Sequence, residues 1–123
     1  MILIIGGAYQ GKLDYARQQF QLSSSDILDC TQLTSELCQK PLTAKCIYHY
    51  EAYIEQCLLA NIEPQTAFSP DQIVIADDIF CGVVPIDSHL RAWRETCGRT
   101  LTALAIDAQS VIRIFCGLPL KVK

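Results

Sequence analysis

The first twenty residues constrain the fold more than any other stretch, because they predict a buried strand that runs directly into a glycine-rich turn and a helix. Residues 1–5 form an unbroken apolar run, as expected for a central strand of a parallel sheet covered on both faces. Residues 13–20 place apolar side chains three and four positions apart, which predicts a helix. Between them, Gly6, Gly11 and Lys12 have the spacing of a loop that cradles phosphate groups.

A phosphate site at this turn would use backbone N–H groups, the helix N-terminus and the Lys12 ammonium. Leu13 stands where the phosphate-loop pattern has Ser or Thr, whose hydroxyl coordinates Mg²⁺. Two interpretations stay open: a nucleotide-binding loop without this ligand, or a tight strand-to-helix turn with Lys12 in solvent. The first predicts these nucleotide-binding residues: Gly6, Gly7, Ala8, Tyr9, Gln10, Gly11, Lys12 and Leu13.

Two acidic residues, Asp77 and Asp78, end a second apolar run within residues 71–78. Ligands of open α/β sheets bind beyond the carboxyl ends of the strands. We therefore expect both carboxylates at the same edge as the Gly6 turn, where they are candidate Mg²⁺ ligands. The alternative is that one of them caps a turn and the other is solvated.

The remaining chain alternates expected strands and helices, which predicts a single three-layer α/β domain over residues 1–123, similar to P-loop NTPases, with a mostly parallel sheet of four or five strands. The expected elements are a short strand at 27–30, a short helix and turn within 31–43, a helix at 44–61, a long helix capped by Asp87 or Ser88, and a last strand at 110–116.

Composition excludes several classes of protein. Seven scattered cysteines without a Cys-x-x-Cys pair indicate neither a disulfide framework nor a zinc site, and argue against a cysteine-based redox module. A net charge of −3 argues against a general nucleic-acid binder. No apolar run approaches the length of a membrane span and no signal peptide is recognisable, so we expect a cytoplasmic protein.

Three motifs in the second half of the chain occur in the order of a known family. They are Ala76-Asp-Asp-Ile-Phe-Cys-Gly-Val-Val-Pro85, Arg91-Ala-Trp-Arg-Glu-Thr-Cys-Gly-Arg99 and Gly117-Leu-Pro-Leu-Lys-Val-Lys123. Together with the opening strand and turn, they resemble the bifunctional adenosylcobinamide kinase / adenosylcobinamide-phosphate guanylyltransferase family of cobalamin biosynthesis. The resemblance covers about half to two thirds of the chain.

The resemblance implies a nucleoside triphosphate, ATP or GTP, bound with Mg²⁺, and phosphoryl transfer to the hydroxyl of a cobinamide. Lys12 and Asp78 are then the expected catalytic residues, Asp77 and Asp78 the expected Mg²⁺ ligands, and Arg94 or Arg99 candidate phosphate contacts. It also implies a corrinoid-binding site and a homo-oligomer, because family members form trimers.

Departures from the family pattern predict impaired activity. Leu13 replaces the Mg²⁺-ligating serine, Phe80 replaces a glycine, and the middle of the chain is shortened where the family carries its guanylyl-accepting histidine. His49, expected within a helix, and His89, at the start of the long helix, do not align with that histidine. The alternative to an impaired enzyme is a non-catalytic relative that binds a nucleotide or corrinoid, or serves in assembly.

Overall fold

The computed structural model describes all residues 1–123 and contains one six-stranded sheet in the order β2-β3-β4-β1-β5-β6. The first five strands are parallel to their neighbours, and β6 pairs antiparallel with β5. The strands are β1 (Ile2–Gly6), β2 (Ile27–Asp29), β3 (Cys46–Tyr48), β4 (Ile73–Asp77), β5 (Ser110–Phe115) and β6 (Leu118–Lys121). This confirms the α/β class and the mostly parallel sheet.

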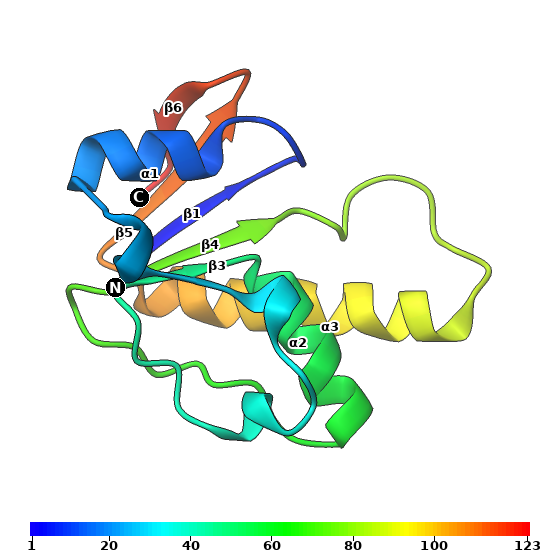
Figure 1. Ribbon diagram of the computed structural model, residues 1–123. Coiled ribbons are helices and arrows are strands. Elements are labelled where there is room, and N and C mark those ends of the chain that lie inside the picture. Colours follow the sequence, from blue (N-terminus) through cyan, green and yellow to red (C-terminus); the bar gives the residue numbers. More distant parts are fainter.

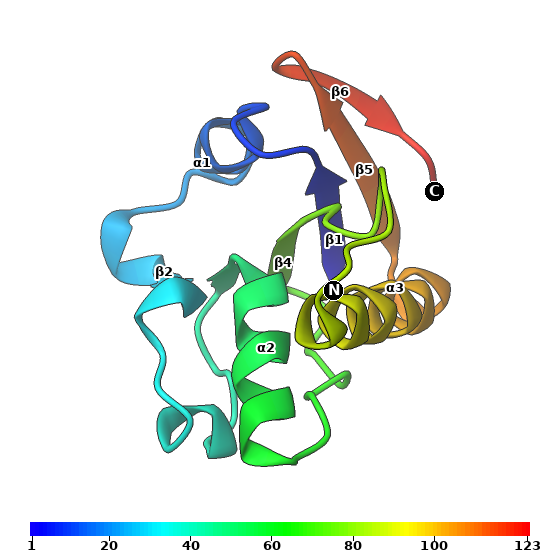
Figure 2. The same ribbon diagram turned by 90° about the vertical axis from the view of Figure 1, so that its right-hand side faces the viewer.

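The helices cover both faces of the sheet, which gives the three layers expected from the sequence (Figure 1). Helix α1 (Lys12–Phe20) lies on one face, and α2 (Tyr50–Ala60) and α3 (Ser88–Asp107) lie on the other (Figure 2). Two buried clusters match these layers: eight residues around Ile4 and Ala16 on the α1 side, and seventeen around Leu3 and Ile54 on the α2 and α3 side.

The unbroken apolar run of the first strand is explained by this arrangement. Leu3 points to the α2 and α3 cluster and Ile4 to the α1 cluster, since successive side chains of a strand point to opposite faces. Strand β1 lies between β4 and β5 in the sheet. The carboxyl ends of β1 and β4 therefore meet, with Gly6 opposite Asp77.

The predicted helix at 44–61 is wrong in its first third, because Cys46–Tyr48 is strand β3. Ile47 lies three residues before Tyr50 and seven before Ile54, so its spacing fits a helical period although it belongs to a strand. Pairing with β2 and β4 decides the conformation of this segment. His49 consequently lies between β3 and α2, as the helix N-cap in the left-handed region (φ 55°), and not inside a helix.

The count of four or five strands is also corrected to six. The last residues were not assigned to an element, yet Leu118–Lys121 pairs with β5 after a turn at Cys116 and Gly117, both with positive φ. In place of the one short helix predicted within 31–43, the structure has two short 3-10 helices, Cys30–Gln32 and Leu37–Gln39. The N-cap of α3 is Asp87, which is one of the two caps predicted from the sequence.

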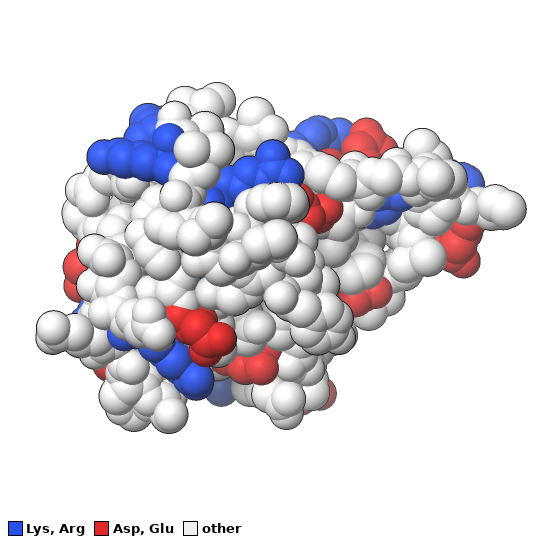
Figure 3. Space-filling model, turned by 90° about the horizontal axis from the view of Figure 1, so that it is seen from above, with Lys and Arg blue, Asp and Glu red and all other residues white.

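The segment between β4 and α3 and the first turns of α3 project beyond the sheet (Figure 1). Its apolar side chains Val83, Val84 and Ile86 are exposed. No helix in the structure is both long enough and apolar enough to cross a lipid bilayer. On the α1 side, basic and acidic side chains are scattered among uncharged residues and form no continuous basic patch (Figure 3).

Candidate functional site

The glycine-rich turn connects β1 to α1 at the carboxyl edge of the sheet. Gly11 is the N-cap of α1 with φ 87°, a conformation that favours glycine. Gln10 fixes the turn to the β5–β6 connection, because its side-chain oxygen accepts a hydrogen bond from the Cys116 N–H (2.7 Å) and its carbonyl accepts one from the Gly117 N–H (2.9 Å). The turn is therefore held in place by residues more than a hundred positions away.

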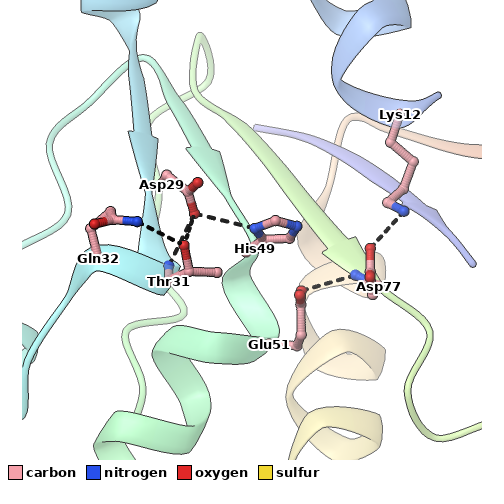
Figure 4. Close-up of polar contacts among 7 residues, drawn as sticks. All are labelled: Lys12, Asp29, Thr31, Gln32, His49, Glu51 and Asp77. Carbon is pink, nitrogen blue, oxygen red and sulfur yellow. Dashed lines mark hydrogen bonds and ion pairs between the residues drawn. The ribbon is translucent and has the colours of Figure 1, made fainter. Parts of the chain in front are cut away.

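Lys12 points back under this turn and is almost fully buried, with 4% of its side chain exposed. Its ammonium donates to the Gly7 carbonyl at 2.6 Å and forms an ion pair with Asp77 Oδ1, also at 2.6 Å. The structure thus excludes the alternative of a solvated Lys12. The same contacts place the ammonium at the end of β4, beside the residues that follow β3 (Figure 4).

Two residues that follow β3 complete this group. His49, Glu51 and Asp77 each direct a potential metal-binding atom to one place, and these atoms lie within 4.8 Å of one another. Glu51 Oε2 accepts a hydrogen bond from the Asp77 N–H at 2.9 Å. The imidazole of His49 lies between Asp29 on one side and Glu51 and Asp77 on the other (Figure 4).

Asp29 at the end of β2 holds the other side of the His49 ring, with Oδ1 3.2 Å from Nδ1. Although partial burial acts in the opposite direction, hydrogen bonds from Thr31 and His49 lower the pKa of the Asp29 carboxyl below its ordinary value. An ionised Asp29 accepts a hydrogen bond from the Nδ1–H group and favours the tautomer whose Nε2 carries a lone pair. The adjacent strands β2, β3 and β4 thus all contribute to one cluster.

Glu51 is the most unusual member of this cluster, because it is a carboxylate with 6% exposure and no cationic partner. Burial raises the pKa of its carboxyl, an effect opposed by the hydrogen bond from the Asp77 N–H and reinforced by the negative charge of Asp77. Its own backbone carbonyl accepts a hydrogen bond from Trp93 Nε1 of α3 at 2.7 Å, which fixes the first turn of α2.

Asp78 contacts different groups from those around Asp77. Its Oδ2 lies 3.9 Å from the Arg113 guanidinium of β5, and its Oδ1 lies beside Gly7. The structure brings Asp77 together with Lys12, His49 and Glu51, and it leaves Asp78 on the β5 side of the turn. The two carboxylates predicted as a magnesium pair therefore belong to two adjoining groups.

Two cavities adjoin the cluster. One of about 460 Å³ is lined by the turn and the start of α1, from Ala8 to Asp14, together with Tyr48, His49 and Asp77. Six of the eight predicted nucleotide-binding residues line it, whereas Gly6 and Gly7 do not. A second of about 390 Å³ includes Glu51, Asp77 and Trp93. Asp77 is common to both cavities, and the cluster therefore lies between them.

The other candidate residues contact protein groups. Arg94 donates to the carbonyls of four consecutive residues, 80–83, and Arg99 pairs with Glu95 at 3.5 Å on the surface. His89 Nε2 lies 3.0 Å from Glu55 Oε1. These contacts assign Arg94 to holding the projecting segment and do not bring Arg99 or His89 into the cluster.

Glu51 and Asp29 were not predicted as site residues. The sequence signal for Glu51 is its position two residues after His49, but this signal is informative only when 46–48 is recognised as a strand. The carboxyl end of that strand then lies at the same edge as Asp77. Asp29 carries the equivalent signal at the end of the predicted strand 27–30.

A family model described as cobinamide kinase / cobinamide phosphate guanyltransferase matches residues 21–122. The chain belongs to this CobU family. The match spans most of the chain, and it confirms the family assigned from the three motifs. Within the CobU match lie β2 to β6 and four members of the cluster, Asp29, His49, Glu51 and Asp77, whereas the turn with Lys12 precedes residue 21. A search of curated proteins found no match.

Proposed function

We propose that this CobU-family chain binds a nucleoside triphosphate through a degenerate phosphate loop at Gly6–Leu13, with impaired phosphoryl transfer to a cobinamide. The observation that carries this proposal is the cavity lined by Ala8 to Asp14, which adjoins the N-terminus of α1 and the Lys12 ammonium. Free N–H groups at a helix N-terminus and a nearby ammonium together favour a bound phosphate.

The chemistry assigned to this site is positioning and charge stabilisation. In the transfer step, the cobinamide hydroxyl oxygen bonds to the γ-phosphorus and loses its proton to solvent, the bond between the γ-phosphorus and the β–γ bridging oxygen breaks, and the nucleoside diphosphate leaves. Lys12 stabilises the negative charge of the phosphates once they compete with the Gly7 carbonyl and the Asp77 carboxylate for hydrogen bonds from its ammonium group. Asp78, beside Gly7, is the second proposed catalytic group.

Magnesium accompanies nucleotides at such loops, and the residues present fit it only in part. Leu13 offers no oxygen ligand, whereas the carboxylates of Asp77 and Asp78 lie at the edge of the turn. The missing hydroxyl is the reason to expect weak phosphoryl transfer. We do not propose guanylyl transfer as an activity of this chain, because neither His49 nor His89 aligns with the guanylyl-accepting histidine of the family.

Calorimetry with ATP and with GTP, each with and without Mg²⁺, tests nucleotide binding. We expect binding by the wild type, loss in Lys12→Ala, and no loss in Lys121→Ala, which removes an exposed lysine of β6. A second variant, Leu13→Ser, restores the hydroxyl and is expected to strengthen Mg²⁺-dependent binding and phosphoryl transfer to cobinamide. No binding by either the wild type or Leu13→Ser would reject the proposal.

A non-catalytic binding module is the second candidate. The hydrogen bonds of Arg94 to residues 80–83 favour it, because this arginine is occupied in holding the projecting segment and is not free to contact a phosphate. Cobinamide or nucleotide binding without turnover, in both the wild type and Leu13→Ser, would support this candidate over the impaired kinase.

A further inference from the structure

We propose that His49, Glu51 and Asp77 form a binding site for one divalent transition-metal ion. Their ligand atoms lie within 4.8 Å of one another, and they come from the ends of two neighbouring strands and the first turn of α2. Zn²⁺ binds imidazole nitrogen and carboxylate oxygen at about 2.0–2.2 Å, so small side-chain rotations bring the three atoms around one ion.

The buried Glu51 carboxylate points to a cation independently of this geometry. It is 94% removed from solvent and no lysine, arginine or histidine pairs with it. A buried charge without a partner is costly. Lys12 neutralises Asp77 through Oδ1, so ionised Glu51 gives the Lys12, Asp77 and Glu51 group a net charge of −1. A divalent cation removes this excess while Asp77 keeps its bond to Lys12 and binds through Oδ2.

The Asp29–His49 contact points specifically to a metal bound by imidazole. In metal sites, the ligand histidine commonly donates its second ring N–H to a carboxylate, which fixes the tautomer and aims the other nitrogen at the metal. Asp29 Oδ1 has this relation to His49 Nδ1 at 3.2 Å. The ring thus presents Nε2 to the side on which Glu51 and Asp77 lie (Figure 4).

The donor set also selects among divalent ions. One imidazole and two carboxylates suit Zn²⁺, Mn²⁺ or Fe²⁺, whereas Mg²⁺ prefers oxygen ligands and retains its water. Three protein ligands leave a coordination position open, and His49 and Asp77 line the cavity of about 460 Å³. A phosphate oxygen of a nucleotide would take this position; that consequence rests on the proposed function, whereas metal binding itself does not.

The test is a titration of nucleotide-free protein with Zn²⁺, Mn²⁺ and Mg²⁺, each alone. The protein carries Cys81→Ser and Cys116→Ser, because these two exposed thiols would otherwise bind zinc. We expect one Zn²⁺ per chain and binding of Mg²⁺ weaker by about tenfold or more. Absence of zinc binding, or equal affinity for Mg²⁺, would overturn the proposal.

Matched variants locate the ion. His49→Asn removes the imidazole but tolerates the left-handed backbone, and Glu51→Gln keeps an oxygen that accepts from the Asp77 N–H. Both should abolish stoichiometric zinc binding, whereas His89→Asn, which removes the only other histidine, should not. Asp29→Asn should weaken binding by about 10–100-fold with little change in melting temperature. Unchanged zinc affinity in His49→Asn would place the ion elsewhere and reject the site, whatever the result with nucleotides.

Discussion

Lys12 connects the glycine-rich turn to the centre of the sheet through one buried ammonium. It contacts both the Gly7 carbonyl and Asp77 Oδ1 at 2.6 Å, so the positive charge of one ammonium group holds the turn against the end of β4. Asp77 is 18% exposed, which limits how far solvent can compensate for loss of the lysine. A lysine in this position contributes to stability as well as to any phosphate contact.

Lys12→Met is expected to lower the free energy of unfolding by about 3 kcal/mol, because it leaves the largely buried Asp77 carboxylate without its partner. Adding Asp77→Asn removes that charge and should recover part of the loss. Urea unfolding in the presence of a chelator measures both variants. A single variant as stable as the wild type, or a double variant no more stable than the single one, would contradict this role of the ion pair.

At the level of the elements, the close approach of β1 to β5 limits what can occupy the end of β1. A Cβ atom on Gly6 would collide with the backbone carbonyl of Ile114. At Gly7, the nearest atoms to such a Cβ would be Gln10 Cγ at 3.5 Å and Asp78 Oδ1 at 3.8 Å, which are ordinary contacts. Adjacent glycines of the same turn therefore differ in their structural requirement.

Gly6→Ala is expected to destabilise the protein by about 3 kcal/mol or more, because the carbonyl belongs to a central strand pair and cannot move alone. Gly7→Ala is the matched control and should change stability by about 1 kcal/mol or less. Thermal unfolding of the two variants distinguishes them. Equal losses in both would show that the collision at Gly6 is relieved by a shift of the strand.

The N-terminus of α3 depends on Asp87, whose Oδ1 accepts a hydrogen bond from the Leu90 N–H at 2.9 Å. Asp87→Ala should cost about 1 kcal/mol of stability, whereas Asp87→Asn, which keeps a capping oxygen, should stay close to the wild type. Denaturant unfolding measures the difference. A loss in Asp87→Asn as large as in Asp87→Ala would indicate that charge, and not the capping bond, is what matters.

The sequence predicts an element well where one periodicity dominates and poorly where two compete. The first strand, the long α3 helix and the strand before Asp77 have long, consistent patterns, and the structure contains each of them. The three residues of β3 fit a helical period as well, and only pairing with β2 and β4 assigns them to the sheet. His49 and Glu51 were missed as a site for this reason, whereas Lys12 and Asp77 follow strands that the sequence identifies.

For the molecule as a whole, the burial of the cysteines reflects the packing of the layered core. Five of the seven are buried, Cys30, Cys38, Cys46, Cys57 and Cys97, and the other two, Cys81 and Cys116, are exposed on connections at the carboxyl edge of the sheet. All seven are free thiols. This agrees with the expectation that most are small buried apolar residues. The exposed and the buried thiols can therefore be counted separately by chemical modification.

In native protein at pH 8, we expect two thiols to react rapidly with a disulfide reagent and five to remain protected. The thiolate is the reacting form, and burial raises the pKa of Cys97 and of Cys46 to about 12, so at pH 8 the thiolate fraction is about one part in ten thousand. Raising the pH to 9 increases this fraction about tenfold but leaves it near one part in a thousand. The reagent also cannot reach these groups without opening of the fold.

Unfolding in guanidinium should make all seven thiols reactive. The double variant Cys81→Ser, Cys116→Ser should lose the rapid phase in the native state and show five reactive thiols when unfolded. A rapid phase of three or more thiols in native wild type would show that one layer of the core opens readily, in conflict with the packing of the helices on the two faces of the sheet.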